Sequence, residues 1–299
     1  MTVPLLMRQE LDFAYGLAEA VSPRIRRVIA ANPSPFTLHG TGTYLVGRRD
    51  VCVIDPGPDL PEHIDALQRA LAGERLTYIL ITHTHLDHSP AAAVLKALTG
   101  ATTYGFGPHG TARGDDPPVE EGADYDFAPD VEVRDGDVIA GDGWTIEVVQ
   151  TPGHTSNHLC FGLREERALF SGDHVMGWST TVISPPDGAM GPYLASLDKL
   201  LHRDDHTYWP THGPSITAPK AHVRAFIAHR RVRETEILNC LKRGIGTIPE
   251  IVAAIYTKVP RTLHRAAGRS VLAHLIHLVE GGHVVCEGGL VESAVFVPR

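Results

Sequence analysis

The segment 82–88 constrains the fold and chemistry of this chain more than any other part of its sequence. It places three imidazoles and one carboxylate in six residues, directly after the apolar run 78–81. The apolar run predicts a buried strand, and because strand side chains alternate, His83 and His85 are expected to point the same way. Nitrogen and oxygen ligands at the end of one strand favour a metal such as zinc over the alternative, a solvated surface turn. Ser89 and Pro90 then predict the N-cap and first residue of a helix.

Three later segments repeat this arrangement of a strand followed by a polar side chain beside a glycine. His154 lies in Thr-Pro-Gly-His-Thr, Asp173 in Ser-Gly-Asp-His, and His212 in Thr-His-Gly-Pro, and each segment follows a short apolar strand. Glycine lets the backbone come close to a ligand. Side chains at the carboxyl ends of several strands can converge on one crevice. The sequence therefore predicts one shared metal site.

This order of motifs, His-x-His-x-Asp-His, Gly-His, Gly-Asp and a late His, resembles the metallo-β-lactamase superfamily from about residue 26 to residue 212. The resemblance implies an α/β fold, the αβ/βα sandwich, with two mixed sheets face to face and helices outside, up to about residue 215. It also implies two metal sites that share one carboxylate. Their ligands would be His83, His85 and His154 for the first metal, Asp87, His88 and His212 for the second, and Asp173 as the bridge.

The bridging aspartate narrows the resemblance. An Asp after Phe-Ser-Gly is similar to glyoxalase II, to lactonases and to the phosphodiesterases of the superfamily, whereas class B β-lactamases lack it. Antibiotic hydrolysis is therefore not expected. The chain is also too short for the cap domain of the larger RNA-processing enzymes of this superfamily.

The expected ligand set supports hydrolysis. Six ligands and one bridging carboxylate can hold two divalent cations about 3.5–4 Å apart, and such a pair lowers the pKa of a bound water toward about 7. Zinc is the first expectation, and manganese or iron also suits mixed nitrogen and oxygen ligands. Asp87 is the candidate catalytic residue, expected to orient the resulting hydroxide. A structural zinc site in a nucleic-acid-binding protein is the non-enzymatic alternative, but such sites are closed by four ligands.

Charge divides the chain in two. Residues 1–219 contain 15 Lys and Arg against 29 Asp and Glu, a net of −14, whereas residues 220–299 contain 12 against 6, a net of +6. The acidic excess concentrates between residues 115 and 142, which is interpreted as a surface insertion. We expect a catalytic domain over 1–219 and a small domain over 220–299.

The small domain has the pattern of a winged helix. A long helix is expected from about residue 220 to 241, and Thr247 with Glu250 forms a capping-box signal for a second helix. A third helix is expected from about Leu263, and the apolar segments 284–286 and 290–291 on either side of Gly288-Gly289 predict a hairpin. On the third helix, Arg265 and Arg269 are weak candidates for binding nucleic acid, the alternative being a structural or dimerising domain.

A metallo-β-lactamase domain followed by a winged helix resembles the β-lactamase-like endoribonuclease group. The resemblance includes the segment 151–155, the segment 170–173, Tyr193 and the pair His229-Arg230, and covers nearly the whole chain. It implies a single-stranded RNA substrate, and related proteins imply the alternative of a thioester, ester or lactone. The basic tail favours RNA, and the acidic first part disfavours polyanions.

The location expected from composition is the cytoplasm. The four cysteines form no Cys-x-x-Cys and are expected to be reduced thiols. The first residues lack the basic start of a signal peptide, and no apolar run approaches the ~20 residues of a membrane span. The sequence carries no indication of the oligomeric state.

Overall fold

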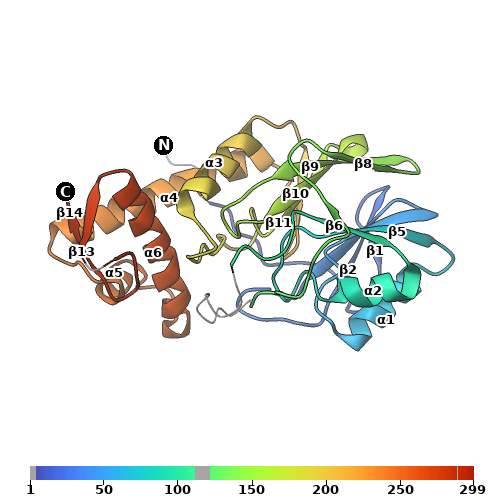
Figure 1. Cartoon of the computed structure of the whole chain (residues 1–299), viewed down its shortest axis with the longest axis horizontal. Helices are drawn as coiled ribbons and strands as arrows, with labels where there is room; N and C mark the ends of the chain where they lie inside the picture. The colour runs from blue at the N-terminus through green and yellow to red at the C-terminus, as the bar shows by residue number, and fades with distance from the viewer. Residues whose placement is uncertain (1–4, 112–121, 288) are drawn as a thin grey trace.

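In the computed structural model, which describes residues 5–111, 122–287 and 289–299, two β-sheets pack face to face (Figure 1). The first sheet contains, in spatial order, β1 (Glu19–Ala20), β2 (Ile25–Ile29), β3 (Gly42–Val46), β4 (Asp50–Ile54), β5 (Arg75–Leu80), β6 (Thr102–Gly105) and β7 (Val131–Glu132). The second contains β12 (Thr207–Pro210), β11 (Ala168–Gly172), β10 (Leu159–Leu163), β9 (Trp144–Gln150) and β8 (Val138–Gly141). Strands β4 to β7 run parallel, as do β11 and β12, and the remaining pairs are antiparallel.

Large aromatic side chains fill the space between the sheets. Tyr44, Trp144, Phe161 and Phe170 are all buried there, and the rings of Tyr44 and Phe170 have their centroids 5.1 Å apart. Aromatic side chains bury the most apolar area per residue, so this layer contributes strongly to the stability of the sandwich.

Helices cover the two outer faces. Helices α1 (Pro61–Ala70) and α2 (Ala91–Thr99) pack on the first sheet, through side chains that include Leu67 and Leu95. Helix α3 (Met190–Leu201) and the first half of α4 (Pro219–Lys242) pack on the second, through side chains that include Leu197 and Phe226. This arrangement confirms the predicted αβ/βα sandwich. Helix α2 begins one residue later than predicted, with Pro90 as its N-cap and no cap bond from Ser89.

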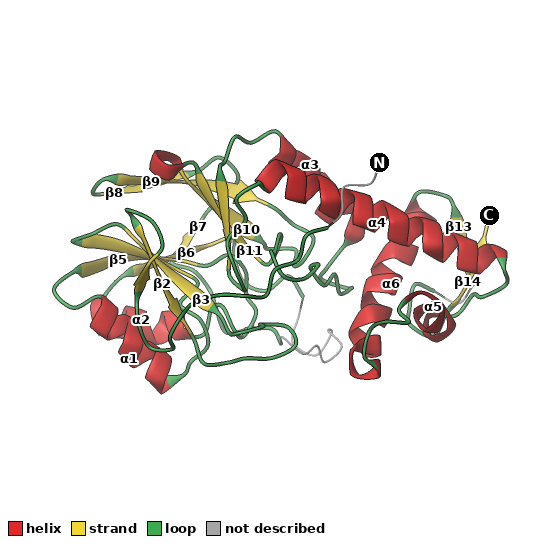
Figure 2. Ribbon diagram, turned by 180° about the vertical axis from the view of Figure 1, so that it is seen from behind, coloured by secondary structure: helices red, strands yellow, loops and turns green. Residues whose placement is uncertain are grey.

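The C-terminal part is a separate helical layer with its own core. The second half of α4 packs with α5 (Ile248–Ile255), α6 (His264–Glu280) and the hairpin β13 (Val284–Glu287) and β14 (Val295–Pro298). Two 3₁₀ turns complete the secondary structure, η1 (Arg164–Glu166) and η2 (Arg261–Leu263). Thr247 and Glu250 form the predicted capping box. Helix α4 runs from the sheets to this layer (Figure 2) and contributes to both cores, so the domain boundary at residues 219/220 stays a prediction.

One detail of the hairpin was predicted wrongly. Its second strand is β14, whereas Leu290 and Val291 lie in the connection with exposed side chains. Phe296 of β14 is buried against the helices. Pairing this later segment with β13 therefore removes more apolar surface from water than pairing Leu290 and Val291 would. Gly288 and part of the acidic segment, residues 115–121, lie outside the described residues.

All four cysteines are free thiols. Among the described residues, no helix combines the length and the apolar character that crossing a membrane requires.

Candidate metal centre

The seven predicted ligands lie together at the carboxyl ends of the central strands. Each sits in the loop that follows β5, β9, β11 or β12, where the two sheets meet. Three overlapping groups have their ligand atoms within 4.8 Å of one another: His83, His85 and His154; His83, His88 and Asp173; and Asp87, His88 and His212.

In the first group, three ring nitrogens converge. Nε2 of His83 lies 3.0 Å from Nδ1 of His85, and Nε2 of His154 lies 3.2 Å from the same Nδ1. A single proton on His85 can serve only one of these two contacts. A cation among the three lone pairs would satisfy all of them.

In the third group, Asp87, His88 and His212, two imidazoles face one carboxylate. Nε2 of His212 lies 3.1 Å from Oδ2 of Asp87, and Nε2 of His88 lies 3.5 Å from that oxygen. Asp173, which belongs to the second group, lies between the first and the third. Its Oδ1 is 3.5 Å from Nε2 of His212 and 3.7 Å from Nε2 of His88, whereas its Oδ2 is 3.9 Å from Nε2 of His154.

Hydrogen bonds on the outer side of the rings fix their orientation. Nδ1 of His154 donates to the carbonyl of Val182 over 2.7 Å, and Nδ1 of His212 donates to the carbonyl of Gly40 over 3.2 Å. With Nδ1 carrying the proton, the lone pair of Nε2 points into the cluster, as a metal ligand requires.

Asp55 orients two further histidines, and sequence reasoning did not identify it as a site residue. This fully buried carboxylate accepts a hydrogen bond from Nδ1 of His88 over 2.9 Å. It also accepts from the hydroxyl of Thr82 over 2.7 Å, so that hydroxyl must in turn accept from Nδ1 of His83, 3.0 Å away. The hydroxyl of Thr211 donates over 3.0 Å to Oδ2 of Asp55, the oxygen that also accepts from His88 and from the Thr82 hydroxyl. The available signal was Asp-Pro-Gly at the end of β4, where Asp55 has a positive φ of 48°.

Glycines before two of the ligands are required by close packing. A Cβ on Gly153 would lie 2.3 Å from the Cα of Tyr193, and a Cβ on Gly172 would lie 2.6 Å from Nε2 of His158. Both also have positive φ. The chain can therefore bring His154 and Asp173 into the cluster only with glycine at these positions.

The electrostatics of the cluster suit a cation. Burial opposes ionisation of Asp87, but the neighbouring His88 and His212 lower its pKa to about 2. Burial likewise opposes a charge on His212, yet Asp173 and Asp87 raise its pKa to about 10. Burial lowers the pKa of His83 and His85 well below the usual value, so these rings are neutral and available as ligands.

Unsatisfied polar atoms point to the same conclusion. Oδ1 of Asp87, Nε2 of His88 and Oδ1 of Asp173 are buried and have no hydrogen-bond partner within the described parts of the chain. Buried polar atoms without a partner are costly, and a divalent ion together with its bound water would satisfy all three. The donor set of imidazole nitrogens and carboxylate oxygens fits a borderline divalent metal.

The two histidines next to ligands differ in their contacts. His158 stacks on His83, with ring centroids 5.1 Å apart, and its Nε2 accepts from the backbone N–H of Asp173 over 3.3 Å. These contacts allow His158 to hold the ring of His83 and the backbone of Asp173 in place. The ring of His174 packs against Tyr193 and makes no hydrogen bond to a ligand in the described residues.

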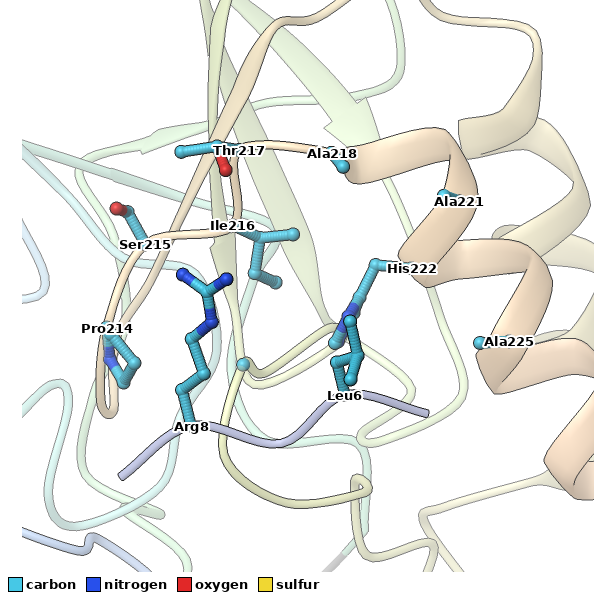
Figure 3. Close-up of a pocket in the computed structure, with 11 residues that line it drawn as sticks. Leu6, Arg8, Pro214, Ser215, Ile216, Thr217, Ala218, Ala221, His222 and Ala225 are labelled. Carbon is cyan, nitrogen blue, oxygen red and sulfur yellow. The ribbon is translucent and has the colours of Figure 1, made fainter. Parts of the chain in front are cut away.

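A cavity of about 310 Å³ reaches the cluster at His154 and Asp173. Its other walls come from the loop 176–182, from α4 and from the C-terminal layer, including Trp178, Tyr256 and Leu263. A smaller pocket of about 110 Å³, between the N-terminal segment and the start of α4, is lined by residues such as Leu6, Arg8 and His222 and contains none of the predicted ligands (Figure 3).

The two arginines proposed for nucleic acid do not form a pair on the surface. Arg265 is exposed, but Arg269 is only 1% exposed. The interpretation of Arg269 as a surface contact was therefore wrong, because a side chain inside the helical core cannot reach a phosphate backbone. Helical spacing places the two residues on one face of α6, one turn apart, and that face is exposed at Arg265 but buried at Arg269.

Comparisons with known families match both parts of the chain. Residues 37–212 match the family described as the metallo-beta-lactamase superfamily. Residues 247–292 match the beta-lactamase associated winged helix domain.

Relatives of similar length share about a third of the sequence. A beta-lactamase-like protein 2 homolog from Caenorhabditis elegans is 34% identical over 284 residues, covering 93% of this chain and 89% of that protein. An atrochrysone carboxyl ACP thioesterase from Aspergillus chevalieri is 32% identical, covering 83% of this chain and 78% of that protein.

Solved structures share the fold over nearly the whole chain. A beta-lactamase domain protein from Burkholderia ambifaria has a TM-score of 0.79 at 20% identity, covering 97% of this chain and 96% of its own. A metallo-beta-lactamase family protein from Thermus thermophilus has a TM-score of 0.75 at 23% identity, covering 94% and 100%.

Proposed function

Because the chain belongs to the metallo-β-lactamase superfamily and carries its associated winged-helix domain, we propose that this metal-dependent hydrolase cleaves the thioester bond of a small acyl substrate. The metals would be two divalent ions, zinc first. His83, His85 and His154 would hold one ion, Asp87, His88 and His212 the other, and Asp173 both.

The observation that carries the proposal is the size and lining of the cavity at the cluster. It measures about 310 Å³, near the lower limit of small-molecule sites. Apolar side chains that include Trp178, Val182, Val259 and Leu263 form much of its wall. Such a wall suits an acyl group, whereas a nucleotide chain needs a long cationic groove. One relative bears the name of an acyl carrier protein thioesterase, which supports the same substrate class.

A divalent ion pair supplies Lewis acidity and a hydroxide nucleophile at neutral pH. Residues of the chain orient the water and hold the metal ligands in place. Asp87 keeps its second carboxylate oxygen, Oδ1, without a partner in the described residues, so it is free to orient the attacking water. Asp55, Val182 and Gly40 fix the rings of three histidine ligands from outside. The apolar wall excludes bulk water from the acyl group.

Single-stranded RNA is the second candidate. The exposed side chains Lys258, Arg261 and Arg265 lie at and next to η2, close in sequence to the cavity residues Val259 and Leu263. They could contact phosphates without reading sequence. The net charge of −14 over residues 1–219 opposes this candidate. A purely structural role for the metal is not favoured, because seven ligands beside a cavity differ from a closed four-ligand site.

The proposal is tested with one substrate panel. An acyl thioester of N-acetylcysteamine, a lactone and labelled single-stranded RNA are each incubated with the zinc-loaded wild type, with Asp87→Asn, and with Asp59→Asn as an exposed control. We expect thioester turnover that falls by about 10²–10⁴-fold in Asp87→Asn, the range for lost acid–base groups, and not in the control. RNA cleavage that depends on Asp87, without thioester turnover, would transfer the assignment to the second candidate.

A further inference from the structure

The wall of the cavity that α4 provides is cationic. His229, Arg230 and Arg233 all line the cavity that reaches His154 and Asp173. Their spacing of three and four residues places them on one face of α4. The three side chains form what we call the α4 cluster.

Arg230 is the central member of the α4 cluster. It is 3% exposed, its guanidinium donates to the carbonyl of Thr181, and it lies 5.1 Å from the centre of the Tyr193 ring. No carboxylate pairs with it among the described residues, and its Nε has no hydrogen-bond partner there. A buried charge is costly unless an opposite charge accompanies it. This side chain therefore lacks an anion.

The neighbours of Arg230 set the charge of the missing anion. Arg233 stacks on Tyr256 at 4.2 Å and is already paired with Glu236 over 2.7 Å. Burial, together with the two arginines, lowers the pKa of His229 to about 4, so this ring is neutral at pH 7. Nε of Arg233 and Nδ1 of His229 are also without partners in the described residues. The α4 cluster thus offers one uncompensated positive charge and several hydrogen-bonding atoms.

We propose that the α4 cluster is an anion subsite that binds a carboxylate on the acyl part of the substrate. The substrate would be an acyl thioester that ends in a carboxylate. This assignment rests on the proposed thioesterase function and adds the kind of acyl group that the site accepts. A carboxylate carries a single negative charge and accepts the paired hydrogen bonds of a guanidinium, which matches Arg230 better than a phosphate dianion does. Arg230 and Arg233 act in binding, away from the bond that is cleaved.

The subsite is tested by binding, with analogues that are not turned over. In these probes an amide replaces the thioester of glutaryl-N-acetylcysteamine or of pentanoyl-N-acetylcysteamine, so the two differ mainly in the terminal carboxylate. Dissociation constants are measured on the full, zinc-loaded chain by calorimetry, with Trp178 fluorescence as a second readout because this side chain lines the cavity. We expect the wild type to bind the glutaryl probe about tenfold more tightly than the pentanoyl probe.

Two variants and one control locate the effect. Arg230→Gln should reduce the glutaryl preference to about twofold or less, and Arg233→Gln should reduce it by about threefold, because one charge-assisted contact is lost in each case. The control is Arg231→Gln, an exposed residue of the same helix, which should keep the preference. If Arg230→Gln does not fold, because its contact with Thr181 is lost, the Arg233 variant decides.

Each outcome has a defined meaning. Equal binding of the two probes by the wild type overturns the subsite, and so does a preference that survives in both variants, which would place the carboxylate on the metals instead. Glutaryl preference without any thioester turnover would overturn the proposed reaction and leave the anion subsite intact. Thioester turnover without a preference for the glutaryl probe would support the proposed reaction and overturn the anion subsite.

Discussion

Replacing Asp55 by Asn is the most informative single change outside the ligands themselves. The buried carboxylate accepts four hydrogen bonds, one at Oδ1 from the backbone of Thr82 and three at Oδ2 from Thr82, His88 and Thr211. In Asn, an NH₂ group takes the place of one oxygen. If it replaces Oδ2, the hydroxyls of Thr82 and Thr211 can turn but the bond from His88 is lost; if it replaces Oδ1, the bond from the backbone N–H of Thr82 is lost. In either orientation one bond to a charged group, at about 1.5–3 kcal/mol, disappears and the remaining bonds weaken because Asn is neutral, which predicts a loss of roughly 2–4 kcal/mol.

The assay is urea denaturation of the wild type, of Asp55→Asn and of the exposed control Asp59→Asn, each with and without zinc. Because Asp55 also fixes His88, the variant should bind zinc about 10–100-fold more weakly, so its stabilisation by metal should shrink. A loss of less than about 1 kcal/mol with unchanged zinc affinity would refute the reasoning that this carboxylate organises the centre.

Three further predictions concern other parts of the molecule. Asp173→Ala should lose one of two metal equivalents in elemental analysis, and unchanged stoichiometry would disprove the bridge. Gly153→Ala should be about 1–3 kcal/mol more destabilising than Gly143→Ala, because both glycines have positive φ but only the first Cβ would meet another residue; equal losses by denaturation would contradict this. Burial lowers the pKa of His274 to about 4, so the neutral ring contributes stability that is present above the unfolded value of about 6.5 and lost as the pH falls through about 4. His274→Gln should therefore flatten the dependence of unfolding free energy on pH in this range, and an unchanged slope would argue against the assignment.

The convergence of the ligands could be predicted because it depends on local patterns, whereas the sandwich fold was expected from the resemblance that the order of these motifs carries. Strand periodicity placed His83 and its neighbours at a strand end, and each of the later ligand segments follows another strand. The capping box at Thr247 and Glu250 is equally local, since both partners lie within one turn of a helix.

What the sequence could not predict depends on contacts between distant residues. Asp55 joins Thr211 across 156 positions, and no local pattern marks that bond. The contact of Arg230 with the carbonyl of Thr181 joins residues 49 positions apart. Arg269 was misjudged because helical spacing alone does not say which turns of α6 are buried. Likewise, the strand at Phe296 competes with an equally apolar segment nearer the turn, and only packing against the helices decides between them.

The central claim is that the histidine and aspartate cluster holds two divalent ions and that hydrolysis depends on both. Metal-stripped protein is titrated with zinc while bound metal is counted by elemental analysis and acyl thioester turnover is followed in parallel. The account predicts two equivalents of zinc per chain and turnover that reaches its full rate only with the second. Full activity in the metal-stripped protein, or saturation of both binding and turnover at one equivalent, would contradict it.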